Sequence, residues 1–342
     1  LVREAGFVIH QPGREPFAVE GIEVAAQFDA TIRAHLKIPE ILEGEVRFRC
    51  ELDAQTFAGS SKFEIAGCRL RTDQLAKFPL VPQQLGIEAA ECAASLTVDC
   101  LHPADQFDPR HLAICLKATV DDIVSTRFGK VCDRIELNLS QQQGAFAVDC
   151  HASPLGGKAQ VDANGDWFAD QPTAEIRWSC AGVRIEDVPS LPAQLENVQG
   201  QCDVDGQVTL VWSDMQIGFD GQTGADLSGA VIAGFVAPQV ALSMRTQGSV
   251  GIMGDAPLRG SVNATARVAE YDLGQLAADC GYAGCNGVVR LAASANTLLE
   301  NLQDLSKLTA ECEISGRGLK AEGLTVDDWQ IDFALKHRIA SL

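Results

Sequence analysis

The feature that most constrains this chain is a strict alternation of apolar and polar residues with a period of two. It is clearest in EVRFRCELDA, residues 45–54, where Val46, Phe48 and Leu52 alternate with charged side chains. Because successive side chains of a β-strand point to opposite faces, this pattern predicts a strand with one apolar and one hydrated face. A protein core, a partner or an apolar ligand could cover the apolar face, and the strand alone does not decide between them.

The same alternation recurs from one end of the chain to the other. It appears in IRAHLKI (32–38), RIELNL (134–139) and WQIDFAL (329–335), among other segments. Clean alternation is typical of antiparallel sheets, since parallel sheets are usually covered on both faces. The sequence therefore predicts an all-β chain built of antiparallel hairpins.

The balance of charge argues against nucleic acid as a partner. The 342 residues contain 27 Lys and Arg against 46 Asp and Glu, and the net charge of −19 repels polyanions.

The longest apolar stretch, residues 230–242, is broken by Gly234 and Pro238 and is shorter than the ~18 residues that a membrane helix needs. Since the chain opens without Met, we expect it to be a fragment of a longer protein, with any membrane anchor outside these residues.

The twelve cysteines form no CxxC motif, and most occupy apolar positions of alternating strands. A thiol in such a position behaves as a small hydrophobic side chain. The nearest pair, Cys280 and Cys285, leaves a disulfide, half of a metal site or a plain turn open, and we favour the turn.

No arrangement of catalytic residues is evident in the sequence. The segment CLHPADQFDPRH, residues 100–111, collects Cys, His and Asp, but its spacing matches no metal-binding motif, and these residue types are common in loops. The chain has no nucleophile elbow, phosphate-binding loop or dinucleotide fingerprint. We therefore predict a protein that is not an enzyme and that uses neither a metal nor a cofactor.

Glycines mark the predicted turns and irregularities of the strands. Asn164-Gly165 lies between two alternating runs, and this dipeptide predicts a two-residue hairpin turn. Gly67 and Gly182 each sit where the alternation shifts by one residue, which indicates a β-bulge. The two bulge segments, 66–70 and 181–185, also resemble each other in sequence.

The similarity between these segments indicates a repeated β-rich module without linkers. The strands are followed by short turns or helices in TDQLAKF (72–78), EDVPSL (186–191) and YDLGQLA (271–277). We interpret residues 1–342 as one continuous repeat-type segment. The approximate units are 30–142, 143–217 and 218–342.

The pattern resembles a known family, the AsmA-like and TamB-like envelope proteins of bacteria, which belong to the bridge-like lipid-transfer proteins. The resemblance lies in DLGQL (272–276) and the looser DVPSL (187–191), followed by GCNGVVRLAAS (284–294), an amphipathic spacer (296–308) and the strands of 311–335. It implies an elongated antiparallel sheet curled into an open apolar trough, with short helices between repeat units.

The resemblance also implies a function and a location. It suggests phospholipid transfer and envelope assembly in the periplasm, with acyl chains held in a hydrophobic groove and an inner-membrane anchor supplied by a segment outside this chain. Phospholipid acyl chains would be the ligand, and proteins of the inner and outer membranes would be further partners.

On this interpretation the apolar residues of the predicted strands line the groove. The candidate lining residues are Ile32, Leu36, Val46, Phe48, Leu52, Leu112, Ile114, Leu116, Ile135, Leu137, Leu139, Phe146, Val148, Ile176, Trp178, Val262, Val268, Leu308, Ile314, Trp329, Ile331, Phe333 and Leu335.

An alternative explains the alternation equally well. The apolar faces could pack on one another as tandem β-sandwiches, in an adhesin-like surface or structural protein without lipid cargo. The many small residues at apolar positions favour the trough, because they would leave a sandwich core under-filled.

Overall fold

Long antiparallel strands make up nearly all of the computed structural model, in two units of the chain, Leu1–Asp170 and Gln171–Leu342. The structure describes residues 1–10, 16–71, 90–104, 109–125, 129–154, 156–188, 198–213, 216–232, 235–251, 258–279, 284–301, 304, 307–321, 323–336 and 339–341. The repeat units expected at 30–142, 143–217 and 218–342 are not tested by this division and stay a prediction.

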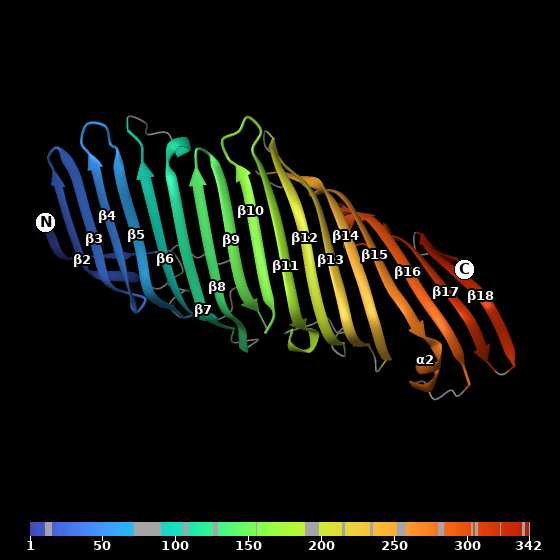
Figure 1. The fold of residues 1–342 in the computed structure, drawn as a ribbon. Helices are drawn as coiled ribbons and strands as arrows, with labels where there is room; N and C mark the ends of the chain where they lie inside the picture. The colour runs from blue at the N-terminus through green and yellow to red at the C-terminus, as the bar shows by residue number, and fades with distance from the viewer. Residues whose placement is uncertain are drawn as a thin grey trace. The chain divides into compact units, whose positions relative to one another are not determined.

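The first unit is a sheet in which each strand pairs with the next one along the chain (Figure 1). Its strands are β1 (Val2–Ile9), β2 (Phe17–Phe28), β3 (Thr31–Ile41), β4 (Gly44–Asp53), β5 (Gly59–Leu70), β6 (Ala90–His102), β7 (Ala113–Ser125), β8 (Gly129–Gln142), β9 (Ala145–Pro154) and β10 (Lys158–Asp166). The 3-10 turn η2 (Pro109–His111) precedes β7.

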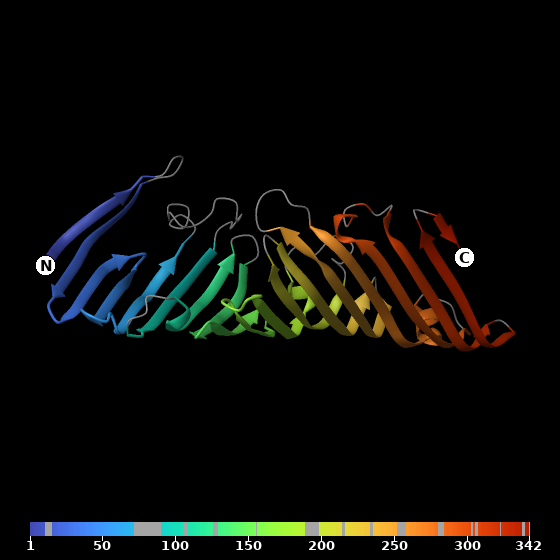
Figure 2. The same cartoon turned by 90° about the horizontal axis from the view of Figure 1, so that it is seen from above.

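In the second unit, too, each strand pairs with the next one along the chain. In Figure 2 the colours of neighbouring strands therefore follow the order of the sequence. Its strands are β11 (Thr173–Arg184), β12 (Gln199–Ser213), β13 (Gln216–Ile232), β14 (Phe235–Gly251), β15 (Arg259–Asp272), β16 (Asn286–Leu298), β17 (Thr309–Ala321), β18 (Leu324–Lys336) and β19 (Ile339–Ser341). The connections include η3 (Ile185–Asp187), α2 (Leu273–Asp279) and η4 (Leu299–Asn301).

The all-β, antiparallel architecture predicted from the alternation is confirmed, and the strands form an unclosed sheet. The turn η3 and the helix α2 follow strands within two of the segments where a short turn or helix was expected, whereas 72–78 lies outside the described residues. In the described part of the chain, no helix has both the length and the apolar character needed to cross a membrane.

Both predicted β-bulges are confirmed. The pairing register shifts between Ile65 and Cys68 and again between Cys180 and Val183, and the intervening Gly67 and Gly182 have φ of 67° and 75°. Each extra residue resets the alternation, so that the residue after the bulge returns to the apolar side of its strand. Cys68, for example, is only 3% exposed.

The hairpin turn predicted at Asn164-Gly165 is wrong. Both residues lie inside β10, where Gly165 is paired with Phe146 of β9. The strand continues because its apolar alternation still matches β9, and because the ring of Trp167 stacks on Phe146 with centroids 4.3 Å apart. Strand pairing has therefore overridden the local turn preference.

A tight two-residue turn occurs instead between β8 and β9. Gln142 pairs with Ala145, and the two residues between them, Gln143 and Gly144, have φ of 52° and 87°. Positive φ at both central residues is the geometry of a type I′ turn, which matches the twist of the flanking strands.

The bulge at Gly67 can be tested by one methyl group. A Cβ at this position would meet nothing within 4 Å, so Gly67→Ala introduces no clash and acts only through the positive φ. We expect the free energy of unfolding to fall by about 1 to 2 kcal/mol, measured by urea denaturation.

Gly218→Ala in β13 is the matched control. Gly218 has an ordinary strand φ, and its added Cβ would make only contacts of 3.7 Å or longer. We expect this variant to be neutral or slightly stabilised. Equal losses in the two variants would contradict a conformational role for Gly67.

Candidate functional site

The register brings apolar residues together in continuous rows on one side of the first unit. Directly opposed residues of antiparallel strands share a face, so a row can be followed from strand to strand. One row from β2 to β10 is Val24, Leu36, Phe48, Phe63, Val98, Leu116, Leu139, Val148 and Ala163. The next row from β3 to β10 is Ile38, Val46, Ile65, Leu96, Ala118, Leu137, Cys150 and Val161. We call this side the apolar face of unit 1.

The side chains of this face are packed sideways but are not sealed from solvent. Val46 and Phe146 are each 7% exposed, whereas Leu36, Phe48 and Leu139 are half-buried. The chain exposes 21359 Å² in total. A compact protein of its mass would expose roughly 13,500 Å², and two compact halves would expose roughly 16,000 Å². The total exposed surface is therefore larger than that of a compact fold.

The second unit has an equivalent apolar face made of smaller side chains. One row is Trp178, Gly206, Thr223, Met244, Ala264, Ala295, Ala310 and Leu335, and the next is Cys180, Val204, Ala225, Leu242, Ala266, Ala293, Cys312 and Phe333. Leu242, Met244 and Phe333 are 40%, 41% and 40% exposed. The alanines leave a hollow of about 430 Å³ beside Leu242 and Met244. Its mainly apolar lining suits an apolar ligand without a fixed polar contact.

Two tryptophans of this face each lie over a glycine of the neighbouring strand. Trp178 is opposite Gly206 and Trp329 is opposite Gly316, and a Cβ on either glycine would come within 2.4 Å of the indole ring. The ring therefore covers backbone that a glycine leaves bare, and glycine at these two positions is required by close approach and not by an unusual φ.

The strand register places most of the candidate lining residues on one side of their sheet, and whether they line a groove stays a prediction. In unit 1 those on the apolar face are Ile32, Leu36, Val46, Phe48, Leu52, Ile114, Leu116, Ile135, Leu137, Leu139, Phe146 and Val148. In unit 2 they are Ile176, Trp178, Val262, Val268, Ile314, Trp329, Ile331, Phe333 and Leu335. Leu112 and Leu308 immediately precede β7 and β17 and belong to no strand.

Sequence reasoning missed several members of both faces. Phe63 and Val98 belong to the central row of unit 1, and their own alternation (Phe63-Ile65 and Leu96-Val98) was a usable signal. In unit 2, Leu242 and Met244 continue the alternation of Val240, but it covers only these three positions, so the signal is short.

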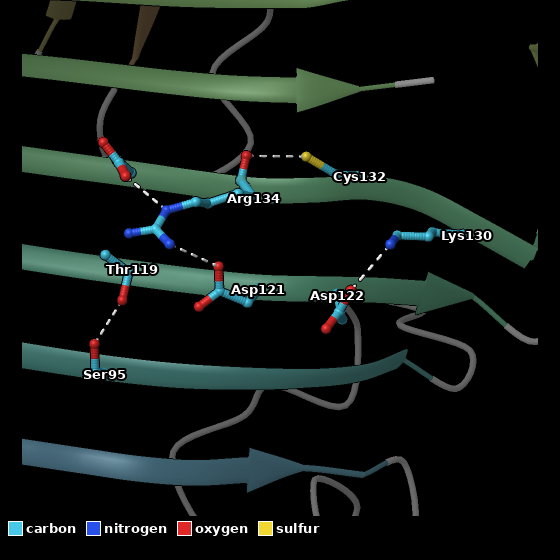
Figure 3. Close-up of polar contacts among 8 residues, drawn as sticks. Ser95, Thr119, Asp121, Asp122, Lys130, Cys132 and Arg134 are labelled. Carbon is cyan, nitrogen blue, oxygen red and sulfur yellow. Dashed lines mark hydrogen bonds and ion pairs between the residues drawn. The ribbon is translucent and has the colours of Figure 1, made fainter. Parts of the chain in front are cut away.

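The opposite face of unit 1 is polar and is crossed by contacts between strands. Figure 3 shows part of it, where Ser95 and Thr119 hydroxyls lie 2.5 Å apart and the guanidinium of Arg134 lies 3.5 Å from the carboxylate of Asp121. Lys130 donates to Asp122 over 3.0 Å, and its hydrogen bonds to Asp133 and Asp122 raise the pKa of its ammonium group. These side chains are solvated, so the contacts help to fix register more than they add stability.

The described cysteines are all free thiols. Burial raises the pKa of the Cys68, Cys92 and Cys100 thiols, and a raised pKa leaves little reactive thiolate. Cys280 lies outside the described residues, so its suggested pairing with Cys285 cannot be placed.

The loop candidate for a metal, residues 100–111, is only partly described. Asp105 and Asp108 lie outside the described residues, and His102 continues strand β6, with its Nε2 3.0 Å from Ser61 Oγ. Within the described ranges, no group of three or more His, Cys, Asp or Glu side chains is placed to hold a metal ion.

Comparison of the chain with protein-family models, with curated proteins and with solved structures found no match in any of the three. The function is therefore inferred from the residues and geometry of the two apolar faces.

The close packing of Trp178 on Gly206 can be tested by adding one methyl group to the glycine. Gly206→Ala should push the indole off the neighbouring strand, because the added Cβ would lie 2.4 Å from a ring atom. We expect a lower melting temperature and a red-shifted tryptophan emission, with a loss of roughly 1 to 3 kcal/mol from overpacking. Gly218→Ala, which has room for its methyl group, should leave the emission unchanged. Unchanged emission in Gly206→Ala would contradict the stacking.

Proposed function

We propose that this protein binds phospholipid acyl chains on its apolar faces and carries them across the periplasm during envelope assembly. The observation that best supports this is the unbroken apolar row of unit 1, which crosses nine strands from Val24 to Ala163 and stays half open to solvent. In this proposal the sheet is an open trough, with acyl chains inside and head groups in solvent.

The energetics favour an oily ligand over bare water. Apolar area contributes about 25 cal/mol per Å² when it leaves water, without any directional contact. Soluble monomers rarely expose a continuous apolar patch of more than a few hundred Å², so a face of this extent needs a covering ligand or partner. Movement along such a face needs a continuous apolar path and no catalytic residue, which is why we propose a carrier and not an enzyme.

The resemblance to AsmA-like and TamB-like proteins supports the rest of the proposal. An inner-membrane anchor outside these residues and partner proteins in the inner and outer membranes would set the two ends of the route. The alternative, a surface or structural protein built of tandem sandwiches, needs a second sheet over each apolar face. The described strands of each unit form one sheet instead.

A pair of neighbouring substitutions tests the proposal. Leu137 lies on the apolar face between Ala118 and Cys150, while Asn138 lies on the polar face between Lys117 and Asp149. Leu137→Asp should lower co-purified phospholipid several-fold, measured by native mass spectrometry, because an unpaired carboxylate among acyl chains costs several kcal/mol. Asn138→Asp introduces the same residue on the other face and should retain the wild-type lipid content.

The melting temperature separates the two possible reasons for lipid loss. If the apolar face contacts lipid, Leu137→Asp should stay folded with a modest decrease in melting temperature. Outright unfolding would indicate a close-packed protein core and would overturn the proposal. Wild-type protein purified gently and free of lipid would overturn it too.

A further inference from the structure

A hollow of about 740 Å³ lies on the polar face of unit 1, over strands β2 to β5. Its charged and polar lining comes from Gln27, Arg33, His35, Arg49, Glu51 and Lys62. Three of these stand in one row, since His35 is directly opposite Arg49 and Arg49 is directly opposite Lys62. On one side the row ends at Ala25, whose short side chain leaves the space open above β2, and on the other it continues from Lys62 to Asp99 of β6.

The hollow is cationic in a strongly acidic protein. Arg33, Arg49 and Lys62 supply three positive charges against the one carboxylate of Glu51, although the whole chain carries −19. A hollow of about 540 Å³ on the polar face of unit 2 has the opposite balance, with one arginine against two glutamates and an aspartate. The positive sign is therefore a local property of β3 to β5 and not a general property of the polar faces.

The central cation of this hollow, Arg49, is attracted by Glu64 of β5 but forms no direct ion pair among the described residues. Arg33 is paired with Glu51 at 3.0 Å, and Lys62 is paired with Glu64 at 2.8 Å. Among the described residues, no carboxylate comes within 4.0 Å of Arg49 and its guanidinium makes no hydrogen bond. A guanidinium has five N–H donors in a fixed fork, and those of Arg49 are free to bind a ligand.

We propose that this hollow is a binding site for a phosphate group. The fork of Arg49 matches two oxygens of a tetrahedral anion, and Lys62 and His35 flank it from the adjacent strands. Because Glu51 lies against Arg33 and Glu64 and Asp99 lie 2.8 Å and 4.0 Å from Lys62, Arg49 is the cation whose charge a phosphate would neutralise. The hydroxyl of Ser60 adds a neutral donor to the lining.

The site is separate from the acyl-chain surface. Arg49 lies between Phe48 and Cys50, whose side chains point to the other side of β4. A lipid seated on the apolar face therefore cannot reach this hollow through the same sheet, and the two proposals can fail independently. The phosphate could come from a soluble phosphate compound or from the head group of a lipid in a bilayer.

Titration of the full chain with inorganic phosphate tests the site. Side-chain NMR signals of Arg49 and His35 should shift in a saturable manner, and the affinity should weaken as ionic strength rises. Arg49→Gln should reduce the affinity by about tenfold or more, because the charged fork is lost. Arg49→Lys keeps the charge without the fork and should bind with an intermediate affinity.

Arg245→Gln is the matched control, because Arg245 is an exposed polar-face arginine of unit 2 that is already paired with Asp220 at 3.0 Å. It should leave phosphate affinity unchanged.

Sedimentation with phosphatidylcholine vesicles, with and without phosphatidic acid, distinguishes a lipid head group from a soluble phosphate compound as the ligand. Capture by phosphatidic acid that Arg49→Gln abolishes assigns the site to lipid head groups, and phosphate binding without capture assigns it to soluble compounds. No saturable shift and no capture, or equal losses in Arg49→Gln and Arg245→Gln, would overturn the proposal.

Discussion

The cross-strand register that keeps apolar residues opposite apolar residues is the constraint on which both sheets depend. Since side chains alternate strictly, a slip of one residue between two strands would move an entire apolar set to the hydrated side. At Gly67 and Gly182 the alternation of apolar and polar residues shifts by one position. The extra residue of each bulge brings the following apolar residues back to the apolar side of the sheet. The polar contacts between strands, such as Ser95 with Thr119, act in the same direction from the other face.

A single-layered sheet gives each residue a role on one side only. In a globular domain most apolar side chains contact a second layer, and a change there disturbs the whole core. Here Leu137 and its neighbour Asn138 face different environments although they share a backbone. The apolar side can therefore be continuous over many strands while the polar side differs from place to place, cationic over β3 to β5 and acidic over β15 to β18.

The sequence predicts the class of fold and most members of the apolar faces, because a period of two is a local property of each strand. It does not predict which strands lie side by side, and so it misses what pairing alone determines. Asn164-Gly165 has a strong turn preference, yet the match between β9 and β10 keeps it extended. The sequence does not reveal the cationic hollow for the same reason, since Arg33, Arg49 and Lys62 belong to three strands and meet only in the folded sheet.

Pairing of each strand with its neighbour along the chain also has a kinetic consequence. Every such contact closes a short stretch of chain, so the entropy cost of each step is small and long-range searches are few. Assembly can then proceed hairpin by hairpin, with stability close to a sum of nearest-neighbour terms, as in linear repeat arrays. In such a sheet, amide-exchange protection should decline gradually from inner to outer strands, and local opening at one hairpin should not dissolve the rest.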